Sequence, residues 1–168
     1  MQVLRLQWRR IASNGMPVVQ VGHFERILLP VDFSSECDVA AHHAAWFAQT
    51  TGGTVHLVHV IVNPLDDLYD THALPPLQVV DAAEAKALSL LRAVAERCLP
   101  ASVTRVLHIR HGDPYEKLRA VADEIHPDLI VLSTRGRGGI AHLVIGSVAE
   151  KIVRHALCPL FVVPRPNK

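Results

Sequence analysis

Short apolar runs alternate with longer amphipathic stretches from about residue 24 to the end of the chain. The runs are rich in Val, Ile and Leu, which is typical of strands buried on both faces of a sheet. They predict strands over residues 26–32, 54–62, 103–109, 129–133 and 160–163.

The stretches between these runs predict helices. Ser34 or Ser35 can cap the first of them, and the Gly52-Gly53 pair can end it. The segment 113–116 (DPYE) is a start signal for the third, with an Asp cap, a Pro in the first turn and a Glu that can complete a reciprocal cap. The expected helices cover residues 36–50, 79–99, 114–126 and 147–156, and residues 63–78, with three prolines, are expected to form a long irregular connection.

Strands that alternate with helices imply crossover connections and a parallel sheet. We therefore expect an α/β protein with a Rossmann-like, doubly wound, five-stranded parallel sheet, helices on both faces and strand order 3-2-1-4-5. Pro30 forfeits a ladder hydrogen bond, so it must lie at the C-terminal end of its strand.

The first 22 residues differ from the rest because they carry three arginines and no acidic residue. They lack the apolar core and the cleavage site of a signal peptide. We expect a disordered extension, or translation that begins at Met16, ahead of one domain over residues 23–166.

Composition narrows the class of protein. A chain of 168 residues with 49% hydrophobic residues can bury the core of one domain, and a formal charge of +1 gives no electrostatic reason to expect nucleic acid or a membrane surface as partner. No apolar run approaches the ~18 residues of a membrane span, so we expect a soluble, cytoplasmic protein.

Three widely spaced cysteines argue against a disulfide framework. None of the eleven histidines lies in a zinc motif, and His56 and His59 should point to opposite faces of one strand, so no metal site made of histidine is expected.

Residues 133–150 (STRGRGGIAHLVIGSVAE) carry the strongest chemical signal. Glycines 136, 138 and 139 permit a close approach of the backbone to a ligand. Gly146-Ser147 opens a helix, whose free N–H groups and dipole suit a phosphate chain. Arg135 and Arg137 add positive charge beside it.

Other interpretations of this segment stay open. It lacks the Lys of a P-loop, and Ala141 stands where a G-x-G-x-x-G motif needs its third glycine. Ser147 and Glu150 could form a capping box, which needs no ligand. The glycines could be a flexible loop, and the arginines a solvated face.

Asp32 ends the first strand as Ser133 ends the fourth. If the two strands are neighbours, Asp32 faces the glycine loop across the switch point of the sheet, where such folds bind ligands. Its carboxylate could then bind a base or ribose, or hold a hydrated Mg²⁺ beside phosphates. Alternatively, Asp32 caps the turn that follows it.

Together these motifs resemble the universal stress protein family. The similar segments are Ile27–Ser34 (ILLPVDFS), His59–Ile61 and Gly112–Pro114. Most specific is the spacing of the ATP-binding subgroup, in which Gly136, nine residues and Gly146-Ser147 match the signature and Ser133 replaces its first Gly. The similarity extends through Ser147–Pro159 and covers about residues 24–165.

The resemblance implies a regulatory stress-response protein that binds ATP, with or without Mg²⁺, and forms a homodimer through residues 160–163. It implies no catalytic residues and at most slow ATP hydrolysis. The nucleotide-binding set that it implies is Pro30, Val31, Asp32, Val60, Leu132, Ser133, Arg135, Gly136, Arg137, Gly146, Ser147 and Val148.

Two other functions stay open. The Cβ of Ser133 could crowd a nucleotide, which would favour a nucleotide-free interaction module. The other is an adenylating or phosphotransfer enzyme on the same fold, a hypothesis that only the similarity of fold supports. The sequence does not separate ATP from AMP or a cyclic nucleotide, and it names neither the stress nor a protein partner.

Overall fold

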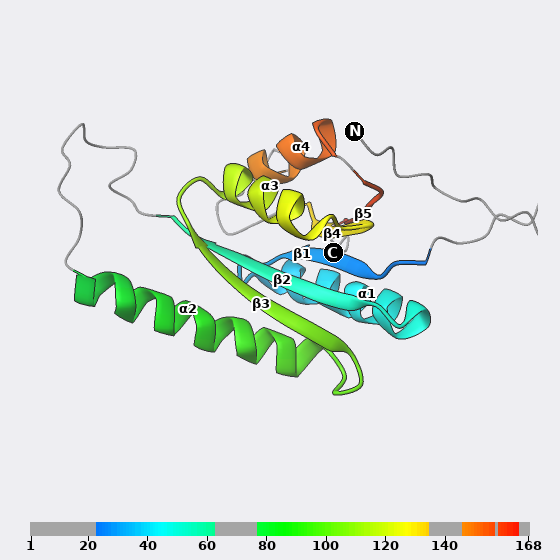
Figure 1. The fold of residues 1–168 in the computed structure, drawn as a ribbon, viewed down its shortest axis with the longest axis horizontal. Coiled ribbons are helices and arrows are strands. Elements are labelled where there is room, and N and C mark those ends of the chain that lie inside the picture. Colours follow the sequence, from blue (N-terminus) through cyan, green and yellow to red (C-terminus); the bar gives the residue numbers. More distant parts are fainter. Residues whose placement is uncertain (1–22, 63–76, 135–145, 157, 165–168) are drawn as a thin grey trace, which may run out of the picture.

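A computed structural model describes residues 23–62, 77–134, 146–156 and 158–164. Within these ranges strands and helices alternate along the chain (Figure 1). The strands are β1 (Arg26–Pro30), β2 (Thr54–Ile61), β3 (Thr104–His111), β4 (Leu129–Ser133) and β5 (Leu160–Val163). The helices are α1 (Ser35–Thr51), α2 (Leu77–Cys98), α3 (Pro114–Ile125) and α4 (Ser147–Arg154). The predictions for residues 1–22 and 63–76 fall outside the described residues.

The strands form one parallel sheet in the order β3-β2-β1-β4-β5, which confirms the predicted fold class and strand order. β1 is the central strand, with Leu28 opposite His56 of β2 and Ile130 of β4. Pro30 is the last residue of β1, as its missing N–H requires. The N–H of Val31 then makes one further bond to Val58 O at 2.8 Å, so the backbone is fixed just beyond the strand.

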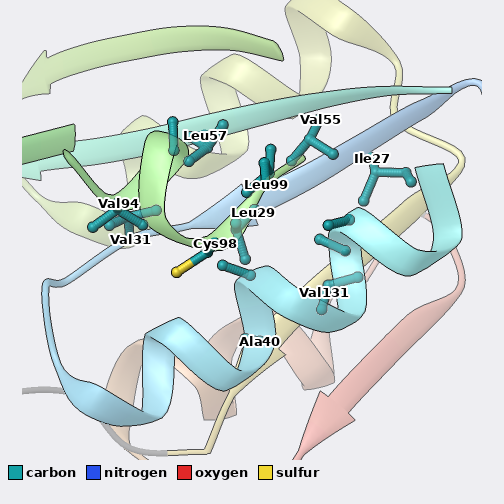
Figure 2. Close-up of a cluster of buried hydrophobic side chains, with 14 of the residues drawn as sticks. Ile27, Leu29, Val31, Ala40, Val55, Leu57, Val94, Cys98, Leu99 and Val131 are labelled. Carbon is teal, nitrogen blue, oxygen red and sulfur yellow. The ribbon is translucent and has the colours of Figure 1, made fainter. Parts of the chain in front are cut away.

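Helices cover both faces of the sheet, with α1 and α2 on one side and α3 and α4 on the other (Figure 1). Because successive strand residues point to opposite faces, Ile27 and Leu29 pack toward α1 and α2, whereas Leu28 packs toward α3 and α4. Figure 2 shows the larger of the two clusters, in which strand side chains pack against Ala40 of α1 and Val94 of α2.

Local signals explain where the helices begin and end. The Ser34 hydroxyl accepts the Cys37 N–H at 3.2 Å, so Ser34, rather than Ser35, caps α1, and Gly52 ends it in the left-handed conformation. Asp113 caps α3 through the Glu116 N–H at 2.9 Å. The predicted starts of these helices are thus correct to within one residue.

Several predicted ends were wrong by a few residues. β1 stops at Pro30 instead of residue 32 because Asp32 already belongs to a turn. α2 begins at Leu77, so the irregular connection does not extend to residue 78. β3 runs on to His111, where it still pairs with Ile61, and α4 ends at Arg154 instead of residue 156. In the part of the chain that the structure describes, no helix has the length and apolarity of a membrane span.

Candidate functional site

The carboxyl ends of β1 and β4 lie side by side in the centre of the sheet. Ile27 pairs with Leu129 and Leu28 with Ile130, so the neighbour relationship on which the predicted site depends is confirmed. The chain leaves β1 toward β2 on one side, while β4 lies on the other. This is the switch point of a doubly wound sheet, where such folds bind ligands.

Asp32 closes the turn that follows β1. Its Oδ1 accepts hydrogen bonds from the Ser34 N–H at 3.0 Å and from the Ser34 hydroxyl at 2.7 Å. The Ser34 Oγ in turn accepts the Cys37 N–H at the start of α1. The interpretation of Asp32 as a turn residue is therefore confirmed, and its contact with a nucleotide or a hydrated Mg²⁺ stays a prediction.

A histidine that the sequence analysis did not place in the site supports this turn from β2. The His59 Nδ1–H donates to Val31 O at 2.7 Å. The imidazole also packs against the Phe33 ring, with centroids 4.2 Å apart. Phe33 has a φ of 63°, in the left-handed region that a bulky residue seldom adopts. The backbone at the end of β1 is thus held in an unusual conformation by contacts with β2.

Both ends of the glycine loop are anchored to the sheet. The Thr134 N–H donates to Val163 O at 3.1 Å, and the Gly146 N–H donates to Thr134 O at 2.7 Å. The loop therefore leaves from and returns to one point at the carboxyl end of β4. Arg135, Gly136 and Arg137, which the sequence places in the nucleotide site, lie outside the described residues.

The start of α4 has no side-chain cap. Gly146 is the N-cap residue, and it has no side chain to accept the first helical N–H groups. The capping box predicted as an alternative for Ser147 and Glu150 is wrong, because Ser147 is already the first helical residue. The Glu150 carboxylate instead binds Arg154, with 2.9 Å between Oε1 and Nη2.

The backbone angles of Gly146 do not require glycine. Gly146 has φ −71° and ψ 154°, which any residue adopts. A side chain at this N-cap position would instead lie next to the first N–H groups of α4.

The residues predicted to contact a nucleotide differ in how deeply they are buried. Val31 and Leu132 are 5% and 3% exposed and lie in the core, so they can offer a ligand only backbone atoms. Val60 and Val148 are half-buried on the α3–α4 side of the sheet, the side on which Leu132 is buried. Ser147 is exposed, and Pro30 and Ser133 are half-buried at the ends of their strands.

No reactive thiol occurs among the described residues of this region. Burial raises the pKa of Cys37 to about 12, and its Sγ lies 3.7 Å from Pro30 O. A buried, protonated thiol is structural rather than nucleophilic. The described residues also contain no group of three or more His, Cys, Asp or Glu side chains that could hold a metal ion.

A surface hollow of about 470 Å³ lies elsewhere, on the outer face of α2. Its lining comes from this single helix, including Leu88, Arg92 and Glu96, and it is open to solvent. A shallow surface on one helix lacks the converging polar groups of a ligand site. We therefore assign the candidate site to the carboxyl ends of β1 and β4 and the start of α4.

Comparisons of the sequence and of the structure with known proteins all point to one family. Residues 23–164 match the universal stress protein family. A universal stress protein of Methanocaldococcus jannaschii is 29% identical over 147 residues, which are 86% of this chain and 85% of that protein. The solved structure of the universal stress protein UspA from Lactobacillus plantarum is 27% identical with a TM-score of 0.72, covering 85% of this chain and 99% of that one.

Two further structures of similar fold contain nucleotides. One is a universal stress protein in complex with cAMP, at 21% identity and a TM-score of 0.61. The other is the universal stress protein from Archaeoglobus fulgidus in complex with dAMP, at 20% identity and a TM-score of 0.55. Each comparison covers 84% of this chain and 98% of the other, and at these identities the likeness is one of fold.

Proposed function

The chain belongs to the universal stress protein family, and on this premise we propose that it is a regulatory protein that binds an adenine nucleotide, ATP in the first instance. The base and ribose would lie at the end of β1 and the phosphates at the start of α4. Occupancy would change the surface that the protein offers to its partners.

The observation that carries the proposal is the uncapped N-terminus of α4, fixed beside the ends of β1 and β4. Gly146 has no side chain to accept the first N–H groups of the helix, and its bond to Thr134 O sets their position. Such N–H groups and the positive end of the helix dipole bind phosphate oxygens. The nucleotide complexes of two proteins of similar fold support the same ligand class.

Each predicted residue then has a limited role. The backbone of Val31 and the carboxylate of Asp32 would contact the base and ribose, with Val60 beside them. Ser147 and the Val148 N–H would bind phosphate, together with Gly136 and the two arginines of the loop. If Mg²⁺ accompanies ATP, Asp32 would hold it through water, because one of its oxygens is already engaged by Ser34.

Ser133 fits this proposal better than its sequence position alone suggests. Strand residues alternate, so Ser133 shares a face with Val131, whose side chain packs in the cluster beneath α1. α4 covers the opposite face of the sheet. The extra Cβ therefore points away from the helix that would bind the phosphates.

We further propose a homodimer that pairs through β5. This strand pairs with β4 at one edge of the sheet, and its residues 160–162 are half-buried in the single chain. An apolar edge strand is a ready template for pairing with a second copy. The position of β5 next to β4 would link this interface to the nucleotide site, since Val163 O binds the Thr134 N–H.

The second candidate is a nucleotide-free interaction module, and Ser133 in place of glycine is the feature that favours it. Calorimetric titration with ATP, AMP, cAMP and GTP, with and without Mg²⁺, separates the two. We expect the adenine nucleotides to bind, Ser133→Gly to bind at least as tightly, and Ser147→Ala to bind more weakly. Ser102→Ala, an exposed serine in the turn before β3, serves as the control. Absence of binding by every nucleotide would favour the interaction module.

A further inference from the structure

His56 of β2 and His108 of β3 form a close pair that the proposed function does not use. The His56 Nδ1 and the His108 Nε2 lie 3.1 Å apart, and the rings are stacked with 24° between their planes. In the register of the two strands His56 lies opposite Val106, so the histidines are diagonal neighbours on one face of the sheet. Both side chains are half-buried.

We propose that His56 and His108 form a two-histidine chelate for a divalent transition metal of the Cu²⁺, Ni²⁺ or Zn²⁺ class. Metal–nitrogen bonds of about 2.0–2.1 Å place two ligand nitrogens about 2.9 Å apart at a right angle and about 3.3 Å apart at a tetrahedral angle. The observed separation of 3.1 Å lies between these values. To bind a metal, each ring must turn so that its nitrogen lone pair points at the metal instead of at the other nitrogen.

The protonation of the pair suits ligation. Burial, the neighbouring His108 and the charge of Arg26 lower the pKa of His56, and burial and the charge of Arg110 lower that of His108. The hydrogen bond between the rings itself requires one of the two facing nitrogens to be unprotonated. The hydrogen bond requires that one facing nitrogen carries a proton, so metal binding shifts that proton to the other nitrogen of the same ring. No net proton release is needed.

Charged groups of both signs lie around the pair. Arg110 is bound to Glu124 at 2.8 Å, and the Arg26 Nε donates to His126 O at 3.0 Å. The Asp128 carboxylate accepts the backbone N–H of Arg26. A metal cation between the two rings would therefore be repelled by Arg26 and Arg110 and attracted by Glu124, so its binding depends mainly on the two bonds to imidazole nitrogen.

This site is separate from the nucleotide site. His56 precedes the end of β2 at Ile61 by five residues, about 16 Å along a strand. Imidazole ligands also select a different class of metal, because Mg²⁺ prefers oxygen. With two protein ligands, the remaining positions are open to water or to a second molecule. Motif searches along the sequence do not find such a pair, because its two members are 52 residues apart.

The test uses the full chain and Cu²⁺–iminodiacetate, in which the chelator leaves two positions for the protein. We expect one site with two nitrogens in its electron paramagnetic resonance spectrum, and affinity at least about tenfold weaker in His56→Gln and His108→Gln. His111→Gln is the matched control, because it lies on the same strand but faces Glu84 of α2. ATP binding should be equal in all three variants, so failure here is distinct from failure of the proposed function.

Wild-type affinity in both His56→Gln and His108→Gln would overturn the proposal. Circular dichroism checks that each variant is folded. If a variant fails to fold, Ni²⁺ titration of the wild-type protein by proton NMR gives the answer, because broadening must begin at the imidazole signals of His56 and His108. Earlier broadening at other histidines would also overturn it.

Discussion

The backbone N–H of Gly146 donates a hydrogen bond of 2.7 Å to the carbonyl of Thr134. This bond joins the residue after β4 to the N-cap residue of α4, so the start of the helix is held at the end of the strand. The Thr134 N–H binds Val163 of β5 in the same place. A ligand bound at the start of α4 would therefore act on a point where two strands and a helix meet.

Replacing His59 with Phe should destabilise the turn after β1. The variant keeps an aromatic ring against Phe33 but loses the donor to Val31 O, which lies 2.7 Å from Nδ1. A buried carbonyl without this donor costs about 1–3 kcal/mol of unfolding free energy, measured by urea denaturation. His155→Phe, an exposed change at the end of α4, should stay within about 0.5 kcal/mol. Equal stability of the two variants would contradict this account of the turn.

Two adjacent glycines after α1 should respond differently to alanine. Gly52 has φ 73° and open space around its Cβ position, so Gly52→Ala should cost about 1–2 kcal/mol through backbone strain. A Cβ on Gly53 would overlap Phe24 O, which the Thr51 hydroxyl also binds at 2.7 Å. We expect Gly53→Ala to cost about 3 kcal/mol and to lower the thermal midpoint further than Gly52→Ala. The reverse order would contradict the packing of this turn.

The thiols should be unreactive in the native protein. Burial raises the pKa of Cys37 to about 12 and that of Cys158 to about 11, and it also raises the pKa of Cys98. Because only the thiolate reacts, about 10⁻⁴ of Cys37 is reactive at pH 8. Iodoacetamide labelling followed by mass spectrometry should be slow in buffer and fast in urea. Fast labelling of Cys37 in the folded protein would be inconsistent with this burial.

The proposed dimer predicts a mass of twice 18.5 kDa by light scattering. Val162→Lys places a charge on the edge strand β5 and should give a monomer, because charged side chains on an edge prevent strand pairing. Val106→Lys, on the opposite edge strand β3, is the control and should remain a dimer. A wild-type monomer, or two variants with equal mass, would rule out pairing through β5.

The alternation of apolar runs and helical stretches was enough to predict a parallel, doubly wound sheet, and the strand order was predicted by analogy with Rossmann-like folds. It also located the site region, because Pro30 had to end its strand and Gly146 had to open a helix. These are local signals, carried by residues that lack an N–H or a side chain. The nucleotide contacts themselves stay predictions, since Arg135, Gly136 and Arg137 lie outside the described residues.

What the sequence did not predict depends on contacts between strands. His59 binds Val31, and His56 meets His108, only because of the register in which β2 pairs with its neighbours. The left-handed conformation of Phe33 is not a local preference of Phe either. The capping box at Ser147 failed for a local reason, because the helix begins one residue earlier than that motif requires.

The most direct test of the central claim is the nucleotide content of the protein as purified. The wild-type protein and Gly146→Val are prepared without added ligand and denatured, and the released nucleotides are identified by chromatography and mass spectrometry. Valine adopts the backbone angles of Gly146 but places a branched side chain next to the first N–H groups of α4. The account predicts an adenine nucleotide from the wild type and none from a folded Gly146→Val. An empty wild-type protein that also fails to take up added Mg²⁺–ATP, or equal nucleotide content in the two proteins, would contradict it.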